Sequence, residues 1–379
     1  MRGPSQHAQS CPSRAATHAR GAARPPWWRG KGGEVVESES ARAIGNMEVS
    51  LVPRAESLQV FFREQHRGGL VDTSGMPTRR ARARGAKGWK IWALAIAGGI
   101  LWGGAPRAAE SRPWALHFVD VGQGAALVAV GHESAVVIDS GPSGSAEALL
   151  KGLEGHGIKR VDLWIHTHFD ADHLGGIVRA EAGMDGVVGT EDDLEVIELW
   201  DRGIDAAPST AVMGAYLDSF GDRRRRPEVG ERWDSGGLMV EVVHRGSEEV
   251  ENGRGIALRL DVGSASVLVL GDLPAAEGVL AAERGGPVDV LWASHHGAAN
   301  GFDPALIDHA DPSAVVISAG FRNSYCHPAP EVLSWLQART VWVTGAAGIG
   351  ADGRCPGLAG SLGGDHRVLG GELVLAVDP

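Results

Sequence analysis

The segment 166–176 constrains the chain more than any other part of the sequence. It packs three histidines and two aspartates into eight residues, directly after a short apolar run that we expect to be a buried strand. Imidazole and carboxylate groups are typical ligands of divalent transition metals. Alternate residues of an extended segment point the same way, so His168, Asp170 and Asp172 can converge. The pattern predicts a metal site, and the two glycines at its end let the backbone turn closely beneath it.

Further candidate ligands follow other predicted strands. They are Asp272, His295, His296 and His327. A rigid scaffold positions a metal site by placing ligands at the ends of separate strands. We therefore expect these side chains to gather around the 166–176 segment, which a polar loop with merely hydrogen-bonded histidines would not require.

The body of the chain, residues 110–379, alternates strand-like runs with segments of helical spacing. Short apolar runs at 116–121, 126–130 and 135–139 are separated by glycine-rich turns, which is typical of a β-meander. Further strands are predicted at 161–166, 194–200, 239–244, 256–262, 266–270, 288–293, 314–318 and 340–344, and helices at 146–153, 274–283, 304–309 and 330–338. This layout predicts one α/β domain in which two mixed sheets form a sandwich flanked by helices.

Charge separates this body from the residues before it. Residues 1–90 hold 16 basic and 7 acidic side chains of the chain's 36 and 47, which leaves 20 basic and 40 acidic residues for the remainder. An acidic body is a poor unaided binder of polyanions, because each phosphate contact normally recruits Lys or Arg. A phosphate substrate would therefore need added cations.

The cysteine content excludes one class of protein. With only 3 Cys in a chain that is 43% apolar, a disulfide-dense scaffold is excluded.

The first 109 residues read as a leader. Residues 1–75 show no sustained period, so we expect disorder. Residues 76–109 combine a basic stretch, an apolar run at 91–102 and small residues, as an export signal does. The run is shorter than the roughly 20 residues that span a bilayer, so we favour a periplasmic or secreted protein over one anchored through 91–104. We hypothesise that translation starts at Met76 and that the residues before it are a gene-model artefact; peptides from them in a digest of the native precursor would contradict this.

Six motifs follow one another along the body. They are Val119-Asp120-Val121-Gly122-Gln123-Gly124, Val137-Ile138-Asp139-Ser140-Gly141, Asp170-Ala171-Asp172-His173-Leu174-Gly175-Gly176, Leu270-Gly271-Asp272, Ser294-His295-His296-Gly297 and Cys326-His327-Pro328. In this order they resemble the metallo-β-lactamase superfamily and, within it, the hydrolase domain of the competence protein ComEC and its stand-alone relatives. The superfamily motif His-x-His-x-Asp-His fits from His168, with Asp170 in place of the second histidine. A start at His166 would put Ala171 where the last histidine belongs, so we interpret His166 as a supporting residue.

The resemblance implies an αββα sandwich that holds two divalent metal ions, zinc or manganese. By family position the ligands would be His168 and Asp170 for one ion, Asp172, His173 and His327 for the other, and Asp272 as the bridge. Two such ions can lower the pKa of a shared water toward neutrality, so no serine or cysteine nucleophile is required. Asp172 and His296 would act in catalysis, His296 as a ligand or as a proton donor to the leaving group.

Two departures from the family pattern concern this site. The Gly-His-Thr ligand expected before the strand that leads to the bridging aspartate is missing, and Glu251-Asn252-Gly253 lies there, as in the ComEC group. Ala125 replaces the aspartate of the family's Gln-Gly-Asp. The residues expected to orient ligands without holding metal are Asp120, Gln123, Asp139, His166 and His295.

Two features leave alternatives open. The run Arg223-Arg224-Arg225-Arg226 can receive a phosphate or a nucleic-acid backbone, or it can be a solvated loop that faces acidic neighbours. No aromatic residues are interleaved with it, so it does not support sequence-specific reading of nucleic acid. Cys326 and Cys355 can pair if the chain is exported, because an oxidising compartment permits the bond.

The sequence thus predicts an exported metal-dependent hydrolase, with a phosphodiesterase or nuclease that acts on DNA or small phosphodiesters as the favoured activity. One alternative is an acyl hydrolase of the lactone or β-lactam type, since the same metal-activated water could attack an acyl carbon. Another is a non-catalytic metal-binding module in DNA uptake. In uptake the chain would serve with a separate membrane partner, and its oligomeric state is left open.

Overall fold

The computed structural model describes residues 47–54, 57–64, 114–131, 134–247, 249–321, 323–345, 355, 362–363, 365–369 and 372–377. The predicted export segment, 76–109, lies outside the described residues, as does most of 1–75. Among the residues that are described, none of the helices has the length and apolar character needed to cross a bilayer.

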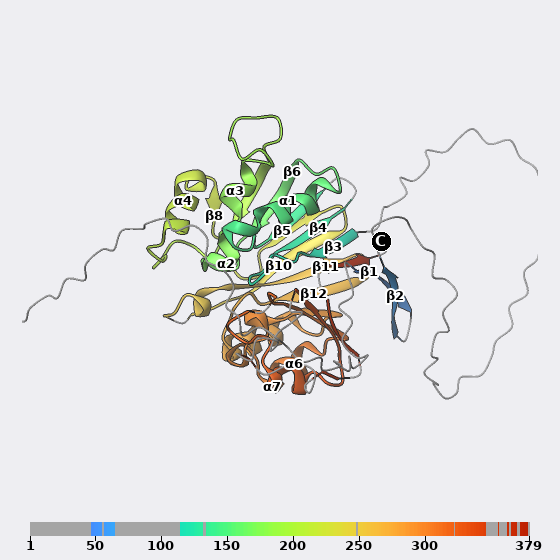
Figure 1. Ribbon diagram of the computed structural model, residues 1–379. Helices are drawn as coiled ribbons and strands as arrows, with labels where there is room; N and C mark the ends of the chain where they lie inside the picture. Colours follow the sequence, from blue (N-terminus) through green and yellow to red (C-terminus); the bar gives the residue numbers. More distant parts are fainter. Residues whose placement is uncertain are drawn as a thin grey trace, which may run out of the picture. The chain divides into compact units, whose positions relative to one another are not determined.

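Two mixed sheets form the centre of the described part of the chain (Figure 1). The first has the order β2 (Ser57–Glu64), β1 (Met47–Arg54), β17 (Leu373–Val377), β3 (Trp114–Phe118), β4 (Leu127–Val130), β5 (Ala135–Ile138), β6 (Arg160–Ile165), β7 (Glu195–Trp200) and β8 (Arg224–Arg225). The second has the order β16 (His366–Val368), β15 (Thr340–Thr344), β14 (Ala314–Ser318), β13 (Val290–Trp292), β12 (Ala265–Val269), β11 (Ile256–Val262), β10 (Leu238–Arg245) and β9 (Arg232–Ser235). Parallel pairs run from β5 to β8 and from β12 to β16, while β3–β5 and β9–β12 pair antiparallel.

Helices cover the outer face of each sheet. They are α1 (Ala146–Glu154), α2 (Ala171–Leu174), α3 (Ile177–Glu181) and α4 (Ala211–Phe220) beside the first sheet, and α5 (Ala275–Gly285), α6 (Pro304–Ala310) and α7 (Pro330–Trp335) beside the second. In Figure 1 the green helices lie on one side of the strands and the orange helices on the other. The predicted α/β sandwich of two mixed sheets flanked by helices is therefore confirmed.

The period-2 pattern of the strands explains these layers. In β11 the side chains of Ile256, Leu258 and Leu260 belong to the core between the sheets, whereas that of Ala257 faces the helices of the second sheet. Successive residues of a strand point to opposite faces, so a strand buried on both faces reads as a continuous apolar run. Burial of each such Leu or Ile side chain contributes roughly 1.5–3 kcal/mol.

The structure differs from the sequence prediction at residues 47–54 and 57–64, which we expected to be disordered. They form the antiparallel strands β1 and β2, and β1 pairs in parallel with β17. A strand's pairing partner can lie far away in the sequence, and here it lies more than 300 residues later, where a local search for periodicity does not detect it. The strand β17 was itself not predicted, although it pairs with β3.

Candidate metal centre

The predicted ligands lie where several strands end. His168 follows β6, Asp172 and His173 belong to the short helix α2, and Asp272 follows β12. His295 and His296 lie in the 3-10 turn η3 (Ser294–Gly297) after β13. Both of these histidines have a positive φ, 48° and 56°, which bends the chain sharply at this point. Gly176 allows α2 to approach the loop after β5, because a Cβ atom there would lie 2.2 Å from the carbonyl oxygen of Ser140.

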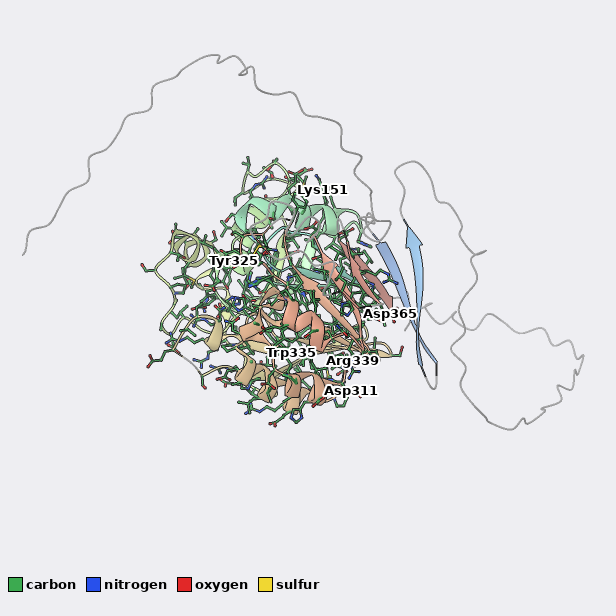
Figure 2. The ribbon with its side chains drawn as sticks, turned by 60° about the horizontal axis from the view of Figure 1, so that its bottom comes forward. Lys151, Asp311, Tyr325, Trp335, Arg339 and Asp365 are labelled. Atoms are coloured by element: carbon green, nitrogen blue, oxygen red, sulfur yellow. A yellow bond between two sulfur atoms is a disulfide. The ribbon has the colours of Figure 1, made fainter. Side chains whose placement is uncertain are left out.

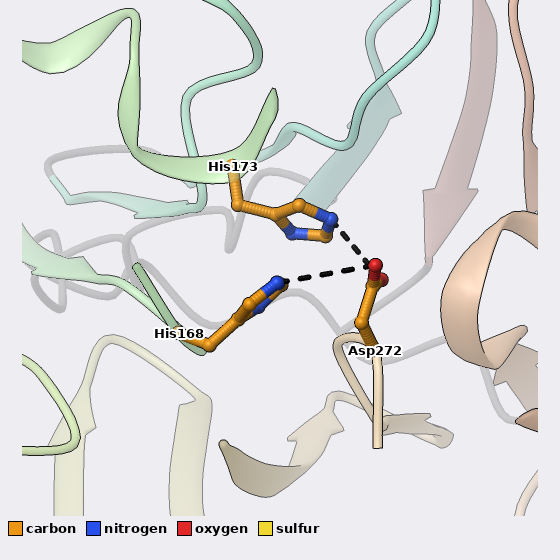
Figure 3. Close-up of side chains that lie close together, drawn as sticks. All are labelled: His168, His173 and Asp272. Atoms are coloured by element: carbon orange, nitrogen blue, oxygen red, sulfur yellow. Dashed lines mark ion pairs between the residues drawn. The ribbon is translucent and has the colours of Figure 1, made fainter. Parts of the chain in front are cut away.

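Two groups of potential ligands share His173. In the first, Nε2 of His173 lies 3.1 Å from Oδ1 of Asp272, and Nε2 of His168 lies 3.9 Å from Oδ2 of the same carboxylate (Figure 3). The second group consists of Asp172, His173 and His296. There Nε2 of His296 lies 3.2 Å from Oδ2 of Asp172 and 3.6 Å from Oδ2 of Asp272. Asp272 therefore lies between the two groups, as a bridging ligand would.

In His168 and His173, a hydrogen bond to Nδ1 determines that Nε2 is the nitrogen that faces the cluster. Asp139 accepts from the Thr167 hydroxyl at 2.8 Å and contacts Nδ1 of His173 at 2.7 Å. A carboxylate only accepts, so Nδ1 of His173 carries a proton, and Nε2 is the nitrogen that faces the cluster and would bind a metal once it loses its own proton. The Thr167 hydroxyl gives its one proton to Asp139. It therefore accepts from Nδ1 of His168 at 3.1 Å, and Nε2 of His168 presents a lone pair.

His296 is oriented in the same way from the opposite sheet. Its Nδ1 lies 3.0 Å from the carbonyl oxygen of Ser318 and donates to it, which leaves a lone pair on Nε2 only 3.3 Å from Nε2 of His173. Nε2 of His168 and Oδ1 of Asp272 are buried and have no hydrogen-bond partner among the described residues. Three imidazole nitrogens converge with buried carboxylate oxygens here, and this set of donor atoms suits a divalent metal. The residues present therefore fit a metal site.

The charged groups of the cluster shift one another's pKa values. Burial would raise the pKa of Asp272, but His173 and His296 outweigh burial and hold that pKa well below its usual range. Burial would lower the pKa of His173, but Asp272 and Asp139 raise it well above the ordinary value for histidine. For Asp172, burial is outweighed by the hydrogen bond to His296 and by His173, and the pKa falls to about 2. The carboxylates thus stay charged and need positive charge beside them, which protons or metal ions can supply.

A comparison with known families agrees with this geometry. The family model described as the metallo-beta-lactamase superfamily matches residues 119–320, which contain both groups of ligands. The chain belongs to this superfamily. The predicted resemblance is confirmed, and the fold normally binds divalent metal ions.

Two curated relatives of this superfamily member are named for competence and for recombination. It is 25% identical over 267 residues to competence protein ComA of Neisseria gonorrhoeae, covering 69% of this chain and 34% of the relative. It is 27% identical over 235 residues to Recombination protein 2 of Haemophilus influenzae, covering 60% and 27%. The chain thus spans about a third of the length of the curated relatives it matches.

Among solved structures the chain matches the metallo-beta-lactamase fold protein YhfI of Bacillus subtilis at 13% identity. The TM-score is 0.37, and the match covers 54% of this chain and 85% of that one.

Two of the predicted ligands lie at the margin of the cluster. Asp170 is 42% exposed, and its Oδ2 lies 3.6 Å from Nε2 of His168, so it is near the first group but outside the buried set. His327 belongs to neither group: its ring centroid lies 6.4 Å from that of His296. His296 lies beside Asp172 and His173 in the second group, and the assignment of His327 as a ligand stays a prediction.

The residues predicted to orient ligands divide into two sets. Asp139 contacts His173 directly and His168 through Thr167, as described above. His295 faces the cluster, with Nε2 3.7 Å from Oδ2 of Asp272. The other three make no contact with a ligand in these interactions. His166 packs its buried ring against Tyr216, Asp120 accepts from the amide of Gly122, and Gln123 accepts from the amide of Gly320.

The arginine run is paired with carboxylates of the chain itself. Arg224 and Asp201 form a buried bidentate pair, with both nitrogen–oxygen distances at 2.6 Å. The other three pair with acidic side chains as follows: Arg223 with Glu181, Arg225 with Glu198 and Glu231, and Arg226 with Asp205. Of the two open alternatives, the structure favours the loop that faces acidic neighbours, and Arg224 in particular is committed to the fold.

One ion pair beside the cluster was missed by the sequence analysis. Oε1 of Glu251 accepts from the amide of Phe169 at 2.8 Å and from Nε of Arg202 at 2.7 Å. The Arg202 guanidinium also lies 4.4 Å from the centroid of the Phe169 ring. Glu251 stands in the sequence where the superfamily's Gly-His-Thr ligand is missing. The missing ligand was the sequence feature that could have drawn attention to Glu251. Its carboxylate stabilises the segment between His168 and Asp170 through the Phe169 amide.

The question of the cysteines is answered by the structure. Cys326 and Cys355 form a disulfide that links residues 29 positions apart. The bond ties the segment before His327 to the C-terminal part of the chain. Asn323 adds to this restraint, because its Nδ2 donates to the carbonyl oxygens of Gly320 and His327 at 3.0 and 2.7 Å.

Asp139→Asn is expected to weaken metal binding by about 10–100-fold, the usual effect of losing a carboxylate that orients a ligand. Asparagine keeps the size of the side chain. Its carbonyl oxygen can still accept from the Thr167 amide, as Oδ1 of Asp139 does at 2.8 Å. Its NH2 group would then face Nδ1 of His173, so the ring would have to move its proton to Nε2, and that lone pair would be lost to the metal.

Calorimetric titration of the metal-stripped variant with Mn²⁺ or Zn²⁺ measures this effect. The matched control is Asp162→Asn, since Asp162 also accepts from a backbone amide, that of Ala135 at 3.0 Å, but contacts none of the ligands. Equal affinities in the Asp139→Asn variant and the wild type would show that this carboxylate does not determine how His173 is presented.

Proposed function

We propose that the chain is an exported, metal-dependent phosphodiesterase or nuclease that hydrolyses DNA or small phosphodiesters. The convergence of three imidazole nitrogens around the buried carboxylate of Asp272 carries this proposal. When bound by these residues, two divalent ions, zinc or manganese, would supply Lewis-acid stabilisation and a water of lowered pKa. The names of the relatives, which concern competence and recombination, favour DNA as the phosphodiester.

The chain's own residues have definable tasks in this reaction. Asp272, His173 and His168 would hold the ions from the buried side, and Asp172 with His296 would complete the second group. His295 is partly exposed on the same cluster, and burial lowers its pKa, so its neutral ring can accept a proton from the attacking water. The cluster contains no serine or cysteine among these groups, so metal-activated water is the nucleophile that fits it.

The charge of the site supports a cation-dependent reaction with phosphate. Asp170, Asp172 and Asp272 surround the place where the substrate would react, and by themselves they repel a phosphodiester. The arginine run offers no nearby substitute, because its members are paired with carboxylates. Phosphate binding at this site therefore depends on the metal ions.

Export is proposed together with the activity. The Cys326–Cys355 disulfide supports it, since disulfides form and persist in oxidising compartments. Because the relatives are named for competence and recombination, we also propose a role in DNA uptake, in which the chain would act with a separate membrane partner.

The proposal is tested by the substrate class that the metal-loaded chain turns over. The full chain is stripped with a chelator, reloaded with Mn²⁺ or Zn²⁺, and given a chromogenic phosphodiester, a DNA oligonucleotide, a chromogenic β-lactam and a lactone. We expect hydrolysis of the phosphodiester and the DNA in the metal-loaded protein, and none in the stripped protein. Faster hydrolysis of the β-lactam or lactone would assign the chain to acyl substrates, and tight metal binding without any turnover would favour the non-catalytic module.

A further inference from the structure

Three aromatic rings lead from the metal centre to the surface. The rings of His296 and His327 are nearly parallel, with an interplanar angle of 21° and centroids 6.4 Å apart. Tyr325 stacks on the outer side of His327, at 29° and 5.8 Å. His296 is buried and belongs to a ligand group, whereas Tyr325 is 67% exposed (Figure 2). The column therefore starts at the metal ligands and ends with a tyrosine ring open to solvent.

The loop that presents Tyr325 is held in place before any ligand binds. Cys326, the residue directly after Tyr325, is restrained by its disulfide with Cys355. The Asn323 side chain closes the turn, because it donates to the carbonyl of His327 and accepts from its amide at 3.0 Å. A loop whose backbone is held in this way loses less conformational freedom on binding, so more of the contact made by Tyr325 contributes to affinity.

We propose that Tyr325 is a stacking platform for an unpaired nucleobase, next to the phosphodiester that reacts at the metal centre. This inference rests on the proposed function and specifies its substrate as single-stranded nucleic acid. Aromatic side chains bind bases by stacking, and every base has a face that fits. In a duplex the bases are stacked on each other, so only a strand that is single or locally open can offer a base to Tyr325.

The electrostatics of the site explain why stacking would matter here. A nucleic-acid strand is normally held by Lys and Arg, but the arginine run of this chain is paired with carboxylates, and the ligand cluster is rich in aspartate. Metal ions can attract the one phosphate that reacts. A neutral ring beside the cluster adds affinity for the adjoining nucleotide without requiring further positive charge. Phe321, which is 60% exposed, offers a second apolar ring on the same loop.

Steady-state kinetics of Tyr325→Ala and Tyr325→Phe test the platform. The metal-loaded full chain is given a short single-stranded thymidine oligonucleotide and, separately, an abasic oligonucleotide of the same length. Loss of one stacked base is worth about tenfold in affinity, so Tyr325→Ala is expected to raise KM about tenfold for the thymidine strand and to leave kcat unchanged. The abasic strand should show no difference, and Tyr325→Phe should behave as the wild type because it keeps the ring.

Trp335→Ala is the matched control, because Trp335 is a partly exposed aromatic residue on α7, 37% exposed and away from the ring column (Figure 2). An unchanged KM in Tyr325→Ala, or an equal rise for both strands, would overturn the base-stacking role. If the wild type turns over neither strand, the proposed function fails separately. In that case the binding of the two labelled strands is measured by fluorescence anisotropy. The inference holds if the wild type binds the thymidine strand more tightly than the abasic strand, and if this difference in affinity disappears in Tyr325→Ala but not in Tyr325→Phe or Trp335→Ala.

Discussion

Asp272→Asn is expected to lower metal-dependent hydrolysis by at least about a thousandfold in kcat/KM, which corresponds to several kcal/mol of lost transition-state stabilisation. The side chain is 4% exposed, and its two oxygens lie within 3.9 Å of Nε2 of His168, His173 and His296. An amide is neutral and offers one acceptor oxygen, so it cannot bridge two cations. It would also leave the surrounding imidazoles without the charge that raises the pKa of His173.

Metal content and turnover are measured on the same preparation. The control is Asp289→Asn, since Asp289 also accepts two hydrogen bonds, from the amide and the hydroxyl of Ser266 at 2.8 Å each, but lies at the start of β13, away from the ligands. The control should keep its metal and its rate. A variant Asp272→Asn that retained two ions and more than about a tenth of the wild-type rate would remove this residue from the bridging role.

The core of the site was predictable because its signals are local. His168, His173 and Asp272 each follow or lie beside a predicted strand, and ligands at strand ends meet in a sandwich of this kind. The position of His296 beside Asp172 and His173 could not be predicted from local patterns. It depends on the left-handed backbone at His295 and His296, which turns the His296 ring inward, and no pattern in the sequence marks that bend.

Features that depend on distant partners could not be predicted from local patterns in the sequence. The arginine run has its acidic partners up to 42 positions away, at Glu181 for Arg223, so its surroundings could not be inferred from its own composition. The strands β1 and β17 pair across nearly the whole chain. The disulfide of Cys326 with Cys355 depends on the approach of two loops, which sequence spacing does not specify. Periodicity predicts elements, and it does not predict which surfaces of those elements meet.

Glu251→Ala is expected to destabilise the fold by about 3–5 kcal/mol, because it leaves the buried Arg202 guanidinium without its carboxylate. The Arg202 side chain is 3% exposed, and its Nε and Nη2 contact the two oxygens of Glu251 at 2.7 and 2.5 Å. The same substitution removes the acceptor of the Phe169 amide, so the segment that carries His168 and Asp170 loses a support. Metal affinity should therefore fall together with stability, although Glu251 holds no metal.

Urea unfolding of the metal-free protein separates these two effects from each other. Glu147→Ala is the matched control: it removes an exposed carboxylate that lies 2.6 Å from Nζ of Lys151, and such surface pairs contribute little to stability. Glu251→Gln keeps an oxygen for the Phe169 amide but not the negative charge, so it should unfold between Glu251→Ala and the wild type. A free energy of unfolding that falls no further in Glu251→Ala than in Glu147→Ala would mean that Arg202 finds other acceptors. The carbonyl oxygens of Gly203 and Asp205, which already accept from its Nη1 at 3.0 and 2.9 Å, would then suffice to hold it.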